Sequence, residues 1–135
     1  MLIHSYLAFF SGGLAVTYIL FSALYSKQSK PLTWMFPAAI SLLFLCFSVF
    51  SIIQEGPLGF WYEHTRNFWG NQIWFDLLIA VGIGWTLLLP LAKELKMNLV
   101  IWAVIVLSTG CIGLSAMLAR ALYLKHRDKV NLGRA

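Results

Sequence analysis

The sequence predicts an all-α integral membrane protein, folded as an antiparallel up-down four-helix bundle. Three observations support this fold class. Hydrophobic residues make up 60% of the chain and charged residues only 11%, whereas a soluble domain carries about 25% charged residues. Four apolar stretches are each long enough to cross a bilayer, which takes about 20 residues. The connections between them are too small to hold a soluble domain, so residues 1–135 are expected to form a single transmembrane domain.

The first two predicted spans cover residues 5–25 and 34–53. The chain from Met1 to Tyr25 has no Lys or Arg, and its apolar run is longer than that of a signal peptide, so we expect this segment to be retained. The connection that follows is polar and short, which makes the two helices antiparallel neighbours. Helices are the expected structure because an open strand leaves its backbone groups unpaired in lipid.

The last two predicted spans cover residues 71–91 and 99–124, joined by a tight basic hairpin at residues 93–98. The connection before them, residues 54–70, is longer. It carries five aromatic residues: Phe60, Trp61, Tyr62, Phe68 and Trp69. Because Trp and Tyr favour the headgroup level of a membrane, we expect this connection to lie at the interface.

The positions of the basic residues predict the orientation. Lys27 and Lys30 follow the first span, and Lys93 and Lys96 lie in the hairpin. Cytoplasmic loops are enriched in such residues, so we expect both termini on the non-cytoplasmic side, in a bacterial inner membrane. The basic C-terminal tail, which the same topology places outside, argues against this orientation.

Charge and cysteine usage exclude several function classes. The net charge is +5, but the basic residues lie at the ends of apolar runs, so the expected partner is membrane lipid and not nucleic acid. Cys46 and Cys111 each sit inside an apolar run and are expected to be packing residues. The sequence shows no zinc-ligand spacing, phosphate loop or nucleophile elbow, so no metal or cofactor is predicted.

Asp76 is the most informative residue because it lies inside a predicted span. A carboxylate there is costly and usually faces the bundle interior with a partner. Small or polar residues recur every four positions around it and should share one helix face: Gln72, Asp76, Ala80 and Gly84. Folding the last two spans about their hairpin brings Arg120 towards Asp76, so we expect the two to pair. Alternatively, the pair only fixes helix register, or Arg120 extends to the headgroups.

The same topology gathers polar side chains on the side of the 54–70 connection. Carboxylates beside a histidine near an apolar cavity can perform general acid–base chemistry. The candidate catalytic residues are Asp76, Arg120, Glu63 and His64, and the candidate binding residues are Asn71, Gln72, Trp74 and His4. The alternative is a solvated loop whose charges face water.

The second half of the chain resembles a bacterial membrane family of unknown function with three spans. Asn71 precedes Asp76 near the start of a span, and the basic hairpin 93–98 and a final apolar segment follow. The resemblance implies a small helical membrane protein and no particular activity.

The same region is similar to the four-span family required for neoxanthin synthesis. The shared residues are Phe75-Asp76-Leu77, followed by Gly82 and Trp85. The chain departs from that family at Gln72-Ile73-Trp74, where a His-Tyr pair is common, and at Thr109-Gly110-Cys111, where a Gly-Pro is expected. The resemblance implies four spans, and it does not imply a carotenoid substrate.

Three functions fit these features. The first is a non-catalytic membrane component or assembly factor, which the small bundle and the lack of a soluble catalytic surface favour. The second is a membrane enzyme that acts on an apolar isoprenoid, pigment or lipid through Asp76. The third is a small dimeric transporter, although the small multidrug-resistance transporters carry their key carboxylate in the first helix. The expected partners are membrane lipid and either another protein or a second copy of the chain.

Overall fold

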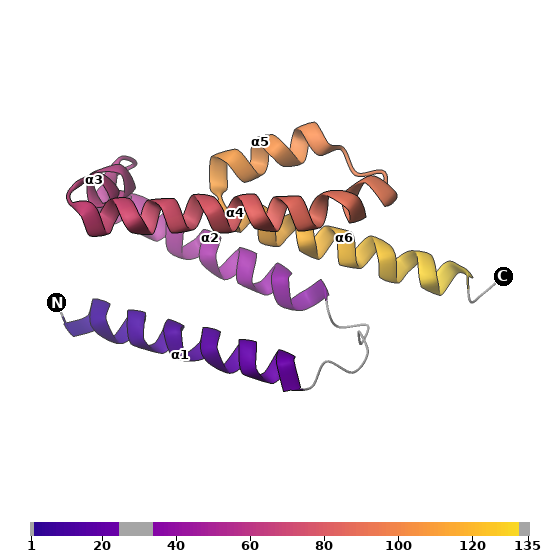
Figure 1. Ribbon diagram of the computed structural model, residues 1–135, viewed down its shortest axis with the longest axis horizontal. Coiled ribbons are helices and arrows are strands. Elements are labelled where there is room, and N and C mark those ends of the chain that lie inside the picture. The colour runs from indigo at the N-terminus through magenta and orange to yellow at the C-terminus, as the bar shows by residue number, and fades with distance from the viewer. Residues whose placement is uncertain (1, 25–33, 133–135) are drawn as a thin grey trace. The chain divides into compact units, whose positions relative to one another are not determined.

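A computed structural model describes residues 2–24 and 34–132, and every regular element in these ranges is a helix (Figure 1). The chain divides into two compact units, residues 1–30 and 31–135. In chain order the helices are α1 (Leu2–Leu24), α2 (Met35–Glu55), α3 (Gly59–Thr65), α4 (Phe68–Glu94), α5 (Leu99–Thr109) and α6 (Cys111–Leu132).

The first unit contains α1, a helix of 23 residues that matches the helix predicted at residues 5–25. Two hydroxyl groups in α1 are hydrogen-bonded within the helix. Thr17 Oγ1 donates to the Gly13 carbonyl at 2.8 Å, and Ser11 Oγ donates to the Ala8 carbonyl at 3.0 Å. These polar side chains therefore add little to the cost of placing the helix in lipid.

Among the residues whose side chains are described, two helices, α2 and α4, are long and apolar enough to cross a membrane. They contain 21 and 27 residues, or about 31 Å and 40 Å of helix, against a hydrocarbon core of about 30 Å. Large apolar side chains on both are exposed, with Leu43 70% and Leu87 74% accessible. The helices predicted at residues 34–53 and 71–91 are confirmed, and their outer surfaces are apolar.

The core of the second unit is built around α6, which packs against α2, α4 and α5. Met117 and Ala121 of α6 are fully buried. Ser41 Oγ of α2 donates to the Ile112 carbonyl at 3.0 Å. At the other end of the contact, the Trp34 and Tyr123 rings form a T-shaped pair with 5.4 Å between centroids. These two contacts show that α2 and α6 run antiparallel.

The single helix predicted over residues 99–124 is wrong, because the chain breaks at Gly110. This residue has φ +59° and ψ −125°, a conformation open to glycine but strained for other residues. The backbone stays paired across the break: the Gly110 N–H donates to the Val106 carbonyl at 2.7 Å, and the Leu114 N–H donates to the Gly110 carbonyl at 3.1 Å. As a result, α5 and α6 form a helical hairpin.

Gly113 lets the two arms of this hairpin approach closely. A Cβ atom there would lie 2.7 Å from Thr109 Oγ1 and 2.9 Å from the Ile105 carbonyl oxygen. Both atoms belong to α5, so the small residue serves the contact between α5 and α6.

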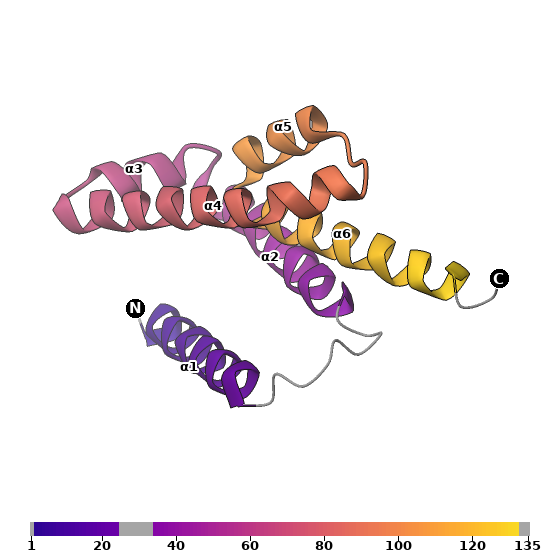
Figure 2. The same cartoon turned by 45° about the vertical axis from the view of Figure 1, so that its right-hand side comes forward.

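The hairpin at Gly110 reverses the direction of the last helix. In both Figure 1 and Figure 2, α6 runs from the middle of α4 towards the α4–α5 turn and past it. Arg120 and Arg127 accordingly line the same hollow as Lys96 and Asn98 of that turn. The prediction that the end of the last helix lies on the side of the 54–70 connection is therefore wrong.

Candidate functional site

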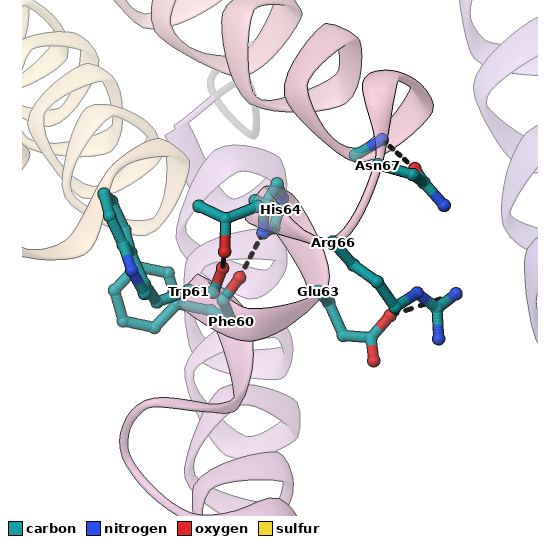
Figure 3. A network of polar contacts seen from close by, with 8 residues as sticks. Phe60, Trp61, Glu63, His64, Arg66 and Asn67 are labelled. Atoms are coloured by element: carbon teal, nitrogen blue, oxygen red, sulfur yellow. Dashed lines mark hydrogen bonds and ion pairs between the residues drawn. The ribbon is translucent and has the colours of Figure 1, made fainter.

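The polar residues of the 54–70 connection are organised by the junction between α3 and α4. Gly56, at φ +84°, ends α2 and lets the chain turn into α3. Asn67 then caps α4, its Oδ1 accepting from the Gly70 N–H at 2.8 Å (Figure 3). The Asn71 side chain donates to the Asn67 carbonyl at 3.2 Å. Asn71, a predicted binding residue, thus stabilises the start of α4.

Gly70 holds α3 against α4 because it has no side chain. A Cβ atom at this position would overlap the Glu63 carbonyl oxygen and lie 3.0 Å from the His64 carbonyl oxygen. Both are backbone atoms at the end of α3 and cannot rotate away. The close approach requires glycine here.

His64 lies on the side of α3 that faces α4. Its ring meets the edge of Trp74 with 5.3 Å between centroids, and Phe60 lies 6.1 Å from the same indole. His64 Nδ1 is hydrogen-bonded to the Phe60 carbonyl (Figure 3), and because a carbonyl oxygen only accepts, Nδ1 is the donor. The structure therefore brings together two predicted site residues, His64 and Trp74, in an aromatic contact.

Glu63 does not join this contact. Its carboxylate lies 3.6 Å from Arg66, and the two side chains are 61% and 69% exposed. They point towards one another in Figure 3. An exposed pair of this kind contributes at most about 1 kcal/mol. Glu63 is a surface carboxylate paired with Arg66.

Asp76 lies on a different face of α4. It follows Trp74 by two residues, a rotation of about 200° around the helix, which turns it away from α3. Its side chain is exposed, as is that of Gln72. Within the described ranges no hydrogen bond or ion pair reaches the Asp76 carboxylate. Asp76 and His64 consequently do not form one acid–base site.

Arg120 lies near the opposite end of α4. Its guanidinium carbon is 5.9 Å from the centre of the Tyr123 ring, and its side chain lines a hollow with Lys96. Asp76 and Lys96 are separated by about 30 Å of helix. The predicted pairing of Asp76 with Arg120 is wrong, because the reversal at Gly110 carries Arg120 back to the α4–α5 turn.

The predicted small-residue face of α4 is used at one end only. A Cβ atom on Gly84 would overlap Leu114 Cδ2, so this glycine admits α6. Ala80 is exposed, like Gln72 and Asp76. His4 lies in α1, and its side chain is outside the described residues. Across residues whose side chains are described, no group of three His, Cys, Asp or Glu could hold a metal ion.

A shallow, open apolar groove on the surface of α4 lies on the same exposed side of the helix as Asp76. It has a volume of about 370 Å³ and is lined by Ile79, Gly82, Ile83, Thr86 and Leu87. Ile79 and Ile83 follow Asp76 at three and seven residues, which places all three on one face. This groove was not predicted from the sequence; Gly82 within a run of large apolar residues is the signal that could have indicated it.

Comparisons of the chain with known protein families, curated proteins and solved structures gave no match.

Proposed function

We propose that the chain is an integral membrane protein in which α1, α2 and α4 cross the bilayer. In this topology α5 and α6 form a re-entrant hairpin that enters and leaves on one side. With 11 residues, α5 is about 17 Å long and reaches about halfway through the core. A break at that depth is tolerated where its backbone groups are paired, and the hydrogen bonds on either side of Gly110 supply that pairing.

The distribution of charge supports one orientation. Arg66 lies at α3 beside Glu63. The other cations in the described ranges belong to the α4–α5 turn or to the half of α6 beside and beyond it: Lys93, Lys96, Arg120, Lys125, Arg127 and Lys129. Because cytoplasmic segments are enriched in Lys and Arg, we place this end in the cytoplasm and α3 on the other side. With the reversal at Gly110, the basic residues of the 93–98 turn and those at the end of α6 lie on the same side of the membrane, so they no longer favour opposite orientations. A bacterial inner membrane remains the proposed location.

We propose further that the protein is a non-catalytic subunit or assembly factor that binds another membrane protein. The observation that carries this is the exposed Asp76 carboxylate, which has no partner within the described residues. Ionisable groups in membrane spans normally face a protein interior and pair there. A partner helix with a cationic or hydrogen-bonding side chain would supply that pairing, and its apolar side chains would fill the groove at Gly82.

The arrangement favours this function over catalysis. An acid–base enzyme needs its proton-transferring groups within reach of one substrate. Here His64 packs against Trp74, Glu63 pairs with Arg66, and Asp76 points away from both. A face that combines a carboxylate with an apolar groove suits a helix partner better.

Asp76→Asn tests the proposal. The full chain, tagged, is extracted from native membranes in mild detergent, and co-purified proteins are quantified by mass spectrometry. A defined partner should be recovered with the wild type and should fall at least tenfold, about 1.4 kcal/mol, in the variant at equal abundance. Glu63→Gln removes the same charge from the solvent-facing pair and should leave recovery unchanged.

Equal recovery of the partner with wild type and Asp76→Asn would contradict the proposed docking face. Gly82→Leu provides a second variant, because it fills the groove and keeps the carboxylate; it should also reduce partner recovery. An apolar small molecule retained by the wild type and lost in Asp76→Asn, with no protein partner, would instead indicate the enzyme.

A further inference from the structure

The hollow beside the α4–α5 turn has the composition of an anion site. Its volume is about 310 Å³, and its polar lining comes from Lys96, Asn98, Trp102, Arg120 and Arg127. We infer that it binds the phosphate group of an anionic phospholipid on the cytoplasmic side of the membrane. This inference rests on the topology proposed above.

The turn that forms one wall is fixed by its backbone. Lys96 has φ +53°, and its N–H donates to the Lys93 carbonyl at 3.0 Å. The next N–H, of Met97, donates to the Ala92 carbonyl at 2.9 Å. Asn98 Oδ1 accepts from the Val100 and Ile101 N–H groups at 3.1 and 3.2 Å, which leaves the Asn98 amide nitrogen as a donor for a ligand.

Two arginines of α6 form the opposite wall. Arg120 and Arg127 are seven residues apart and share one face of the helix, with Leu124 between them and only 9% exposed. Arg127 lies 3.4 Å from Asp128, and both side chains are about half exposed. That pair is weak and uses one of the five guanidinium N–H donors. Arg120 is exposed and lies 5.9 Å from the centre of the Tyr123 ring, so both arginines keep most of their donors for a ligand.

The charge balance in the hollow is positive. Three of its lining residues are cationic and none is acidic. Glu94, which precedes the turn, is exposed and does not line the hollow. Arginine forks match the geometry of phosphate oxygens, so the site suits a phosphate better than a carboxylate-bearing or neutral ligand.

The position of the hollow favours a lipid. Its surface is almost wholly polar, so it would hold the phosphate group, and the acyl chains would lie beside it in the bilayer. Trp102 favours the headgroup level. Basic pockets between membrane helices on the cytoplasmic side are known to hold anionic headgroups. Free inorganic phosphate carries the same kind of charged oxygen atoms as the phospholipid headgroup, so the experiment below distinguishes these two ligands.

The test compares two triple variants of the full chain by native mass spectrometry in neutral detergent. The first changes the hollow: Lys96→Gln, Arg120→Gln and Arg127→Gln. The second removes the same charge around it: Lys93→Gln, Lys125→Gln and Lys129→Gln. Wild type should retain phosphatidylglycerol over phosphatidylcholine, the first variant should lose at least about tenfold in affinity and the second less than about threefold.

A wild-type measurement covers the case in which the first variant does not fold. Phosphatidylglycerol with a photoreactive headgroup should crosslink to peptides 95–98 and 120–127. Crosslinks confined to other peptides would overturn the lipid site. So would displacement of the lipid by millimolar inorganic phosphate, which would assign the hollow to the free ion.

Failure of the lipid site is distinguishable from failure of the membrane topology. Release of the wild-type chain from native membranes by alkaline carbonate would overturn the topology. Retention in the membrane, combined with equal loss of phosphatidylglycerol in both triple variants, would overturn the hollow alone.

Discussion

At Gly70 the contact between α3 and α4 leaves no room for one methyl group. Gly70→Ala places a Cβ atom against the carbonyl groups of Glu63 and His64, and overpacking of this kind costs about 1–3 kcal/mol. We expect thermal unfolding in mild detergent, followed by Trp fluorescence, to shift to lower temperature. The matched change Gly82→Ala meets no atom within 4 Å and should not destabilise the protein. Similar unfolding of both variants would mean that α3 does not pack on α4 as described.

At the scale of elements, the α5–α6 hairpin sets the separation between residues 100 and 125. Spin labels are placed at Val100→Cys and Lys125→Cys, with the native cysteines changed to Ser. They should lie close together, since both residues lie beside the α4–α5 turn. One continuous helix would separate them by about 38 Å. Because a side chain at the Gly110 conformation costs about 1–3 kcal/mol, Gly110→Ala should add a population near that longer distance. A wild-type distribution centred at about 38 Å would disprove the hairpin.

At the scale of the whole molecule, the proposed topology predicts which segments lie on the same side of the membrane. In oriented membrane vesicles, a membrane-impermeant maleimide should label Lys96→Cys and Lys129→Cys from the same side and Glu63→Cys from the other, all in a background with Cys46 and Cys111 changed to Ser. The proposed topology predicts this outcome, because it places the α4–α5 turn and the basic end of α6 together in the cytoplasm. Labelling of Lys129→Cys together with Glu63→Cys would instead support a last segment that crosses the bilayer completely.

Much of the helical structure could be predicted from the length of the apolar runs, which identified α1, α2 and α4. The break at Gly110 could not, because glycine is common in membrane helices and composition does not distinguish a bent segment from a straight one. The prediction that Gln72, Asp76, Ala80 and Gly84 share one buried helix face was only partly right. Steps of four residues advance about 40° beyond a full turn, so Gly84 reaches α6 while Asp76 stays on the exposed side. The predicted interior site at Asp76 assumed that residues 99–124 form one straight helix and that Asp76 shares a buried face with Gly84, and neither assumption is correct.

The turn at Gly110 also affects how the chain is made. If residues 99–132 formed one straight helix through the membrane, the basic end of α6 would have to pass through hydrocarbon during synthesis. Its lysines and arginines would each cost about 2.5–3.5 kcal/mol at the bilayer centre. As a re-entrant hairpin, the segment inserts only its apolar part into the membrane. The proposed topology keeps its charged end on the cytoplasmic side, where the ribosome is, during the whole of synthesis. Residues 99–132 would then need no transfer of charge across the membrane, and the basic end of α6 would be open to soluble proteins as soon as it is synthesised.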